Sequence, residues 1–140
     1  MPTCIFCAIA QGTIPSALLH STPNTLAFLD IAPVHPGHAL VIPKAHHPTL
    51  WDLPPDLGRE LLEVMQLVSG AILKVTNAEG LNVMMNNYRA AGQLVDHAHF
   101  HLIPRHEGDG LHLWPQSSYS APEEMQAMAA SITAVLAEQG

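Results

Sequence analysis

Charge, cysteine and long apolar runs are all scarce in this 140-residue chain. Charged residues make up 12% of it, and only five residues are Lys or Arg, against 12 that are Asp or Glu. Five scattered cations cannot neutralise the phosphates of a long polyanion, so the composition excludes a general binder of nucleic acid polymers. No apolar run approaches the roughly 18 residues that cross a bilayer, and we expect no membrane partner.

The N-terminus, Met1-Pro2-Thr3-Cys4, has no basic region ahead of an apolar stretch, so we expect no secretory signal and a cytoplasmic location. Hydrophobic residues make up 48% of the chain, enough to bury the core of one domain over residues 1–140. The only two cysteines are Cys4 and Cys7. Their spacing suits a metal clip or a redox pair better than a structural disulfide. A redox pair is the weaker interpretation, because a thioredoxin-type motif should follow a strand.

Histidine, in contrast, is abundant, with ten residues in the chain. Histidine enrichment indicates metal binding or chemistry near neutral pH. His97, His99 and His101 alternate with apolar residues, and on a strand such residues would share one face. The alternation alone leaves three interpretations open: a metal-binding face, a solvated polar face and a catalytic site. We interpret His106 and His112 as surface residues.

The apolar periodicity predicts an α+β domain with an antiparallel sheet of about five strands, a long central helix and a C-terminal helix. We expect the central helix to begin in the Leu53–Asp56 segment and to end near Asn77. Pro43 and Pro104 should end the strands that precede them. Ser120 and Glu123 fit a capping box before the last helix, whose inward side chains would be Met125, Met128, Ile132 and Val135. The remaining expected elements are a helix over 4–11 and strands over 17–20, 25–30, 39–42, 81–86 and 98–103.

The segment Gly92-Gln93-Leu94-Val95-Asp96-His97-Ala98-His99-Phe100-His101-Leu102-Ile103 resembles the signature of the histidine triad (HIT) family. Other segments resemble the family in the same order along the chain. Together they cover residues 4–106, and residues 107–140 form a variable C-terminal segment with a helix. The resemblance implies a single HIT domain whose sheet extends across a homodimer. The further matching segments are Cys4–Cys7, Gly12–Ser16, Ala27–Ile31, Pro36–His38, Val41–His46 and Asn86–Asn87.

The resemblance also implies a reaction. A purine nucleotide or nucleoside phosphate would be the substrate, cleaved from a phosphoramidate, a dinucleoside polyphosphate or a related ester through a nucleotidyl-histidine intermediate. His99 would be the nucleophile, oriented by the His97 carbonyl, while His101 and Gln93 would contact the phosphate or the leaving group. No organic cofactor is implied. The expected nucleotide contacts are Asp30 on the ribose, Asn86 on the phosphate, and Phe6, Ile9 and Ile31 around the base.

Some members of the family bind zinc through a cysteine pair and two histidines. The corresponding residues here are Cys4, Cys7, His46 and His97, which we predict to hold a structural zinc ion. The alternative is a pair of reduced thiols beside histidines that are joined by hydrogen bonds.

Leu94 departs from the pattern, because a hydroxyl residue that contacts the phosphate often follows the glutamine in this family. Leucine in place of the hydroxyl residue removes one hydrogen bond, worth about 1 kcal/mol. A second function therefore stays open: a nucleotide-binding, zinc-stabilised interaction protein with little catalytic activity.

Overall fold

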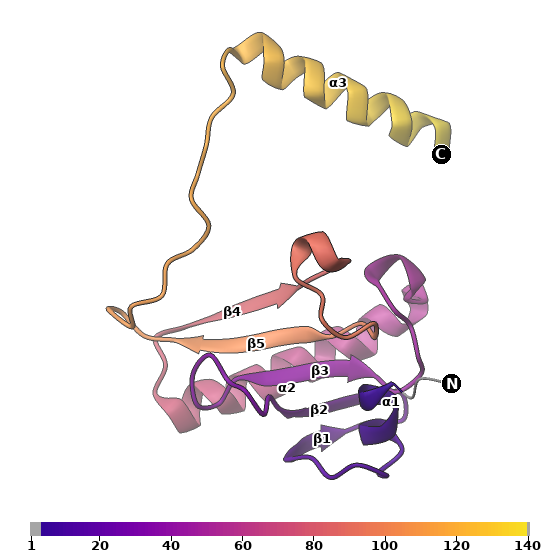
Figure 1. The fold of residues 1–140 in the computed structure, drawn as a ribbon, viewed down its shortest axis with the longest axis vertical. Coiled ribbons are helices and arrows are strands. Elements are labelled where there is room, and N and C mark those ends of the chain that lie inside the picture. The colour runs from indigo at the N-terminus through magenta and orange to yellow at the C-terminus, as the bar shows by residue number, and fades with distance from the viewer. Residues whose placement is uncertain (1–3, 140) are drawn as a thin grey trace. The chain divides into compact units, whose positions relative to one another are not determined.

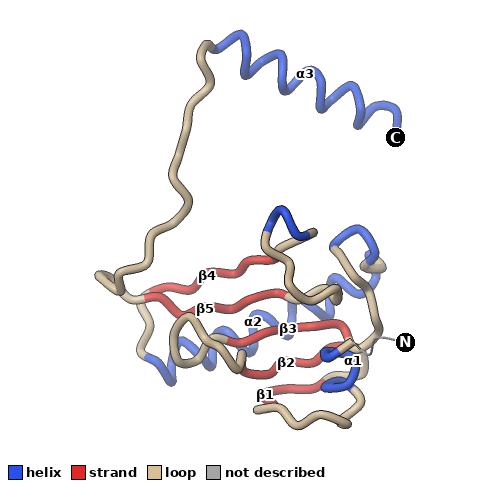
Figure 2. The backbone as a smooth tube through the Cα atoms, in the orientation of Figure 1, coloured by secondary structure: helices blue, strands red, loops and turns tan. Residues whose placement is uncertain are grey.

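The computed structural model describes residues 4–139, which divide into two units at Asp109 and Gly110. The first unit contains a five-stranded antiparallel sheet, confirming the predicted α+β class (Figures 1 and 2). The strands lie in the order β1-β2-β3-β5-β4. Their bounds are β1 (Leu18–Ser21), β2 (Thr25–Leu29), β3 (Ala39–Pro43), β4 (Gly80–Met85) and β5 (Phe100–Arg105).

Both faces of the sheet are covered, because successive side chains of each strand point to opposite sides. On one face, Ala27, Val41 and Leu102 pack against the long helix α2 (Gly58–Thr76). On the other face, Phe28 and Leu40 pack with Phe6 of the short helix α1 (Ile5–Ala10). Figure 1 shows α2 running behind the sheet and α1 near one end of it.

The long helix follows the predicted apolar stripe, with Leu61, Val68 and Ile72 buried. It begins later than expected, at Gly58, because Pro55–Leu57 forms a separate 3-10 turn. A further 3-10 turn, Leu50–Asp52, precedes it. The helix ends as predicted at Asn77, whose left-handed φ of 54° stops it.

The strand that carries the histidines also begins later than predicted. β5 begins at Phe100 rather than Ala98, and it runs through Pro104, which lies opposite Leu81 of β4. The proline is tolerated because β3 pairs with β5 only as far as Leu102. Pro43 likewise belongs to β3, opposite Thr25. Each strand includes its proline, so the expectation that the strands end before Pro43 and Pro104 was wrong.

The second unit contains one helix, α3 (Pro122–Gln139). Ser120 donates from its backbone N–H and its hydroxyl to the carboxylate of Glu124, so the capping partner is Glu124 rather than Glu123. None of the helix's side chains is buried, and the prediction of an inward apolar stripe was wrong for this unit. Within residues 4–139, no helix is long and apolar enough to cross a membrane.

Candidate active site

The three alternating histidines come together at the start of β5. His97 and His99 precede the strand, and the backbone there bonds outside the sheet, with the Ala98 N–H donating to the His47 carbonyl at 2.6 Å. His101 lies on β5 opposite Leu40, on the face that Phe6 covers. His97 and His99 are buried, with exposed fractions of 0% and 6%. The ring of His99 lies 5.0 Å from that of His101, centroid to centroid.

His99 is held in one tautomer by the backbone. Its Nδ1 lies 2.7 Å from the carbonyl oxygen of His97. Because a carbonyl can only accept, the ring hydrogen of neutral His99 is on Nδ1. The other ring nitrogen, Nε2, therefore carries the lone pair. The ring of Phe6, 5.1 Å away at an interplanar angle of 79°, packs edge-to-face against His99. The arrangement gives His99 a fixed ring with a basic, nucleophilic Nε2.

His38 is the residue that the sequence interpretation missed. The Val34 N–H donates to His38 Nδ1 at 3.0 Å, so the hydrogen of neutral His38 is on Nε2. That Nε2–H then donates to His101 Nδ1 at 2.9 Å. The hydrogen of neutral His101 is therefore on Nε2. The buried His38 and the half-buried His101 thus align so that His101 can donate from its far nitrogen, Nε2.

Burial keeps both of these histidines neutral. Desolvation, together with the smaller effects of the neighbouring His99 and His38, lowers the pKa of His101 to about 4, against the opposing negative charge of Asp30. Desolvation also lowers the pKa of His38, opposed by the negative charge of Asp30. At neutral pH the pair can accept and donate hydrogen bonds without carrying charge.

A glycine brings His38 to this position. Gly37 has a φ of +96°, and a Cβ on it would lie 2.8 Å from the Thr76 methyl carbon. Only glycine satisfies both the left-handed backbone and the close approach to α2. The sequence signal was the Pro36-Gly37-His38 segment ahead of a buried strand.

The expected nucleotide-contacting residues lie in varied surroundings. Asp30 Oδ2 is 3.5 Å from His38 Nε2, and its Oδ1 accepts the Ala32 N–H at 2.9 Å. Phe6 is buried and Ile9 packs beside it, whereas Ile31 is 100% exposed. Contacts of these residues, and of Asn86, with a nucleotide stay predictions. Asn86 itself lies against Gly92, in the connection between β4 and β5.

Gln93 is buried, and its amide holds the loops around the triad. Its Nε2 donates to the carbonyls of Pro48, at 2.6 Å, and Val95, at 3.0 Å. Its Oε1 accepts the N–H of Tyr88, which has the unusual φ of 69°. Both N–H donors of the amide are therefore used, and its oxygen accepts one hydrogen bond. A contact of Gln93 with a phosphate stays a prediction, and it requires one of these bonds to be exchanged.

The four predicted metal ligands lie together. Their ligand atoms, the sulfurs of Cys4 and Cys7 and one ring nitrogen each of His46 and His97, are within 4.8 Å of one another. His97 Nδ1 is 3.5 Å from Cys4 Sγ and 3.6 Å from Cys7 Sγ, and His46 Nδ1 is 3.3 Å from Cys7 Sγ. Zinc bonds of about 2.3 Å to sulfur and 2.0–2.1 Å to nitrogen place tetrahedral ligands about 3.5 Å apart.

The outer contact of His97 also suits a metal. Its Nε2–H donates to the Pro43 carbonyl at 2.8 Å, which leaves Nδ1 unprotonated and directed at the thiols. Desolvation is the largest cause that lowers the pKa of His97, so the ring is neutral as a ligand must be. The donor set and its spacing fit a tetrahedral zinc ion.

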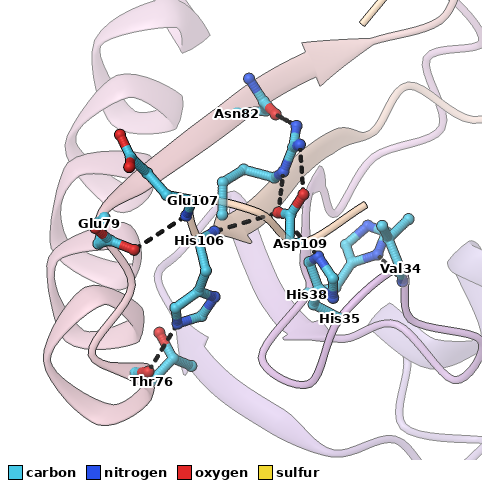
Figure 3. Close-up of polar contacts among 10 residues, drawn as sticks. Val34, His35, His38, Thr76, Glu79, Asn82, His106, Glu107 and Asp109 are labelled. Carbon is cyan, nitrogen blue, oxygen red and sulfur yellow. Dashed lines mark hydrogen bonds and ion pairs between the residues drawn. The ribbon is translucent and has the colours of Figure 1, made fainter. Parts of the chain in front are cut away.

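Two further histidines lie in a different polar cluster at the other end of β5 (Figure 3). Asp109, almost buried, accepts from Arg105 Nε at 2.7 Å and Nη2 at 3.0 Å. His35 Nε2 lies 3.2 Å from the same carboxylate, and His106 Nε2 lies 3.2 Å from the Thr76 carbonyl. His106, which we interpreted as a surface residue, is half-buried. We call Arg105, Asp109, His35 and His106 the Asp109 cluster.

Comparison with known proteins gives consistent results. The chain is 44% identical over 133 residues to an adenosine 5'-monophosphoramidase of Schizosaccharomyces pombe, covering 94% of this chain and 96% of that protein. It is 41% identical over 115 residues to an adenylylsulfatase of Arabidopsis thaliana, covering 82% of this chain but only 57% of that longer protein.

Solved structures match as well. A member of the HIT family from Bacillus subtilis superposes with a TM-score of 0.86 at 38% identity, covering 94% of this chain and 95% of that one. A zinc-bound histidine triad family protein from Mycobacterium smegmatis superposes with a TM-score of 0.74 at 34% identity, covering 95% and 97%. The family model described as HIT domain matches residues 11–108, well over half of the sequence. The chain belongs to the HIT family.

Proposed function

We propose that the protein is a nucleotide hydrolase that releases a nucleoside monophosphate from a phosphoramidate or a related phosphoric ester or anhydride, with His99 as the nucleophile. The observation that carries the proposal is the bond from His99 Nδ1–H to the His97 carbonyl. It fixes the ring and leaves Nε2 free to attack phosphorus.

The reaction proceeds in two displacements. His99 Nε2 forms a bond to the α-phosphorus as the bond from phosphorus to the leaving amine or oxygen breaks, and the leaving group takes a proton from the solvent. Water then adds to phosphorus and releases one proton to the solvent, the bond to Nε2 breaks, and the nucleoside monophosphate departs with His99 neutral again. Dividing one displacement into two lowers the barrier of each.

His101 and His38 supply the fixed donor for this chemistry. Because His101 accepts from His38 at Nδ1, its Nε2–H can donate to a phosphoryl oxygen or to the leaving atom. The pKa of about 4 means that this donor is neutral and stays in place throughout the neutral range. Asp30, on the other side of His38, is the candidate acceptor for the ribose hydroxyls.

The names of similar proteins favour one class of leaving group. The names of two similar proteins specify an adenosine phosphoramidate and an adenylyl sulfate, and both substrates carry an adenylyl group on a small leaving group. We therefore favour small leaving groups on a purine nucleotide. Leu94, 78% exposed, offers no hydroxyl to a longer phosphate chain.

A zinc ion held by Cys4, Cys7, His46 and His97 would be structural. Four protein ligands leave no open coordination position, so the ion would supply no Lewis acid to the substrate. Its place is between α1, which carries Phe6, and the segment before His99. Zinc binding would fix Phe6 against the His99 ring.

The exposed strand β4 supports a homodimer. It is one edge of the sheet, and Val83 on it is 54% exposed. Such an edge can pair with the same strand of a second copy and extend the sheet. We infer that the biological unit is a symmetric dimer joined at β4.

Mass spectrometry of the purified protein mixed with adenosine 5'-phosphoramidate tests the enzyme proposal. We expect a transient gain of one adenylyl group on the peptide that contains His99, followed by release of adenosine monophosphate. His99→Ala should give neither, and His112→Ala, an exposed histidine, should behave as wild type. Turnover that continues in His99→Ala contradicts the proposal.

The second candidate, a nucleotide-binding interaction protein with little catalysis, is favoured by Leu94. It predicts saturable binding of adenosine monophosphate with neither adduct nor product from the phosphoramidate. Replacing the leucine with the hydroxyl residue that often stands there, in Leu94→Ser, separates the two: only an enzyme should gain turnover, by about fivefold for one added hydrogen bond of about 1 kcal/mol.

A further inference from the structure

Two aromatic side chains stack on the surface of the first unit. The ring of Trp51 lies 5.4 Å from that of Tyr88, centroid to centroid, at an interplanar angle of 11°. Trp51 belongs to the 3-10 turn Leu50–Asp52 and Tyr88 precedes the 3-10 turn Arg89–Ala91, and Figure 2 shows the two turns beside each other. The rings are 68% and 61% exposed, and neither belongs to a core cluster of the described residues. We call Trp51 and Tyr88 the aromatic pair.

The backbone of Tyr88 has a conformation that ordinarily requires glycine. Its φ of 69° and ψ of 160° lie where a side chain clashes with the backbone. Within residues 4–139 the only other non-glycine residue with positive φ is Asn77, which ends α2 in the left-handed region that asparagine tolerates. Such strain persists only where the surrounding contacts fix it, and it concentrates at ligand-binding sites. The strain indicates that the Tyr88 side chain has a use that glycine could not serve.

The contacts that fix Tyr88 are made largely by Gln93. The Tyr88 N–H donates to Gln93 Oε1 at 2.8 Å, and the Tyr88 carbonyl accepts the Gln93 N–H at 3.1 Å. The Ala91 N–H donates to the same carbonyl at 3.1 Å. Gln93 is the residue expected to contact the phosphate or the leaving group. The Tyr88 ring is therefore held at a set place relative to the expected position of the reacting phosphorus.

Trp51 is connected to the same glutamine through the segment between β3 and α2. Gln93 Nε2 donates to the Pro48 carbonyl at 2.6 Å. Trp51 follows Pro48 by three residues, so their Cα atoms are at most about 11 Å apart. Between them, the Leu50 N–H donates to Asn87 Oδ1 at 2.8 Å and joins this segment to the connection between β4 and β5. Both members of the aromatic pair thus extend from the segments that surround Gln93.

The residue after Gln93 adds a further apolar side chain. Leu94 is 78% exposed and offers no hydrogen bond to a phosphate chain. The one cation of the connection between β4 and β5, Arg89, donates from Nη1 to the Leu94 carbonyl at 3.4 Å. An uncharged leucine and two aromatic rings favour contact with an apolar, planar group over contact with a chain of charged phosphates.

We propose that the aromatic pair binds the leaving group of the substrate, and that this group is an amine carrying a planar aromatic ring on a short, uncharged linker. The inference rests on the proposed function, because it assigns the part of the substrate beyond the α-phosphorus. The purine is expected on the other side of phosphorus, at Phe6 and Ile9. The chemistry is the proposed displacement: the P–N bond breaks as His99 Nε2 bonds to phosphorus, and the aromatic amine departs with a proton from the solvent.

A matched pair of substrates tests the aromatic contact. Adenosine 5'-N-(2-phenylethyl)phosphoramidate and its 2-cyclohexylethyl analogue have leaving amines of similar size, but only the phenyl ring is planar. We expect the wild type to favour the phenylethyl compound by about fivefold in kcat/KM, the size of one aromatic stacking contact. Trp51→Leu and Tyr88→Leu should lower this ratio to near one, and Tyr88→Phe should keep it.

Three kinetic results would overturn the proposal. The first is a wild-type ratio near one. The second is an equal loss of turnover in Trp51→Leu for both compounds and for unsubstituted adenosine 5'-phosphoramidate, which means that the pair only supports the loops. The third concerns the source of the ring: diadenosine triphosphate carries a second planar base on a charged chain, and a higher kcat/KM for it than for the phenylethyl compound excludes an amine as the preferred leaving group.

The strain at Tyr88 is tested by a second pair of variants. Tyr88→Ala and Tyr88→Gly both remove the ring, so both should lose the preference for the phenylethyl compound. Only glycine relieves the backbone, and we expect Tyr88→Gly to unfold at a temperature about 3 °C higher than Tyr88→Ala. Equal unfolding temperatures would mean that the tyrosine is held without strain, and the argument from its conformation would fail.

Binding without turnover separates this inference from the catalytic proposal. The chain contains two tryptophans, so Trp51 is the only one left in a His99→Ala, Trp114→Phe variant, and its fluorescence reports on the aromatic pair. We expect the phenylethyl compound to change this fluorescence and to bind about fivefold more tightly than the cyclohexylethyl compound. Equal affinities overturn the leaving-group site. A fivefold preference in binding, with no turnover by protein that retains His99, refutes the catalytic proposal and leaves the site assigned.

Discussion

The two ends of β5 carry histidines in opposite circumstances. Before its first residue, His99 is bonded to one carbonyl, and its remaining nitrogen has a free lone pair. Beyond its last residue, His106 is hydrogen-bonded to the Thr76 carbonyl. His35 contacts the Asp109 carboxylate, which also accepts hydrogen bonds from Arg105. The first arrangement leaves a reactive atom, and the second uses histidine to join segments. Residue type alone does not distinguish the two.

The two ends are nevertheless linked through the connection between β2 and β3. That connection carries His35, which reaches the Asp109 cluster, and it ends at His38, which reaches His101. The Asp109 cluster therefore holds the base of the loop from which His38 and Asp30 reach the triad. We expect substitutions in the Asp109 cluster to lower the stability of the protein. They should affect catalysis only by displacing the loop that carries His38 and Asp30.

The largest expected effect separates the two ends by chemistry. His99→Ala should lower kcat/KM for adenosine 5'-phosphoramidate by about 10⁴-fold or more, as expected when a nucleophile is removed. His106→Ala, at the other end, should change kcat/KM less than threefold. Steady-state kinetics measures both. Comparable losses in the two variants would show that the contrast between the ends is not a contrast of function.

The second effect concerns the metal, which belongs to the triad end only. His46→Asn removes one of the four predicted ligands and should lower the free energy of unfolding by about 4 kcal/mol, the size of effect that follows loss of a structural metal. His47→Asn is the matched neighbour, since the His47 side chain is not in the cluster. Zinc content by elemental analysis and urea unfolding are the measurements. One zinc per chain in both variants would contradict the assignment.

The third effect belongs to the Asp109 end. Asp109→Asn leaves the Arg105 guanidinium beside a neutral amide, and breaking a buried pair in this way costs about 3 kcal/mol of unfolding free energy. Glu63→Gln breaks an exposed pair with Arg59 and should cost less than about 0.5 kcal/mol. Urea unfolding compares them. We expect kcat of Asp109→Asn to fall severalfold at most, and a loss near that of His99→Ala would contradict a bracing role.

The fourth effect tests the link between the ends. His38→Phe keeps a ring in place but cannot donate to His101 Nδ1, so the proton on His101 is no longer fixed at Nε2. We expect kcat to fall about 30-fold, a size typical for loss of a residue that orients a functional side chain by a hydrogen bond, with KM nearly unchanged. His35→Phe is the matched change on the same connection. If it lowers kcat as much as His38→Phe does, the loop position matters and the hydrogen bond does not.

The sequence predicted what depends on local pattern and on the family's motif order. The stripe from Leu61 to Ile72 correctly predicted α2, and the quoted motifs correctly predicted that Cys4, Cys7, His46 and His97 lie together. The role of each site residue stays a prediction.

What the sequence could not predict depends on contacts distant in the chain. β5 begins late because the Ala98 N–H bonds to the His47 carbonyl rather than to a strand. The contact of His38 with His101 depends on the pairing of β3 with β5, which places Leu40 opposite His101. Met125 and Ile132 of α3 are exposed although their spacing suits a buried face, because the described part of the second unit contains no other helix or strand to cover them.

The smallest expected effect is in the pH dependence of stability. The pKa of His101 is about 4 in the folded protein and near 6.5 in the unfolded chain. Between these values only the unfolded chain binds the proton, so the stability from neutral burial is fully present above about pH 6.5 and is lost as the pH falls toward 4. His38 and His97, whose pKa values are also lowered by burial, act with the same sign.

Urea unfolding at about pH 7 and pH 5 measures this loss, because that window lies above 4.5, the ordinary pKa of Glu60, below which the stability from its lowered pKa of about 2 begins to be lost. His101→Asn removes the histidine whose pKa is lowered to about 4. This variant should therefore lose less stability between the two pH values than wild type does. His112→Asn, an exposed histidine, should lose as much as wild type. An equal loss in all three proteins would mean that the triad end of β5 is not the neutral, buried end, and the contrast with the charged Asp109 cluster would have to be abandoned.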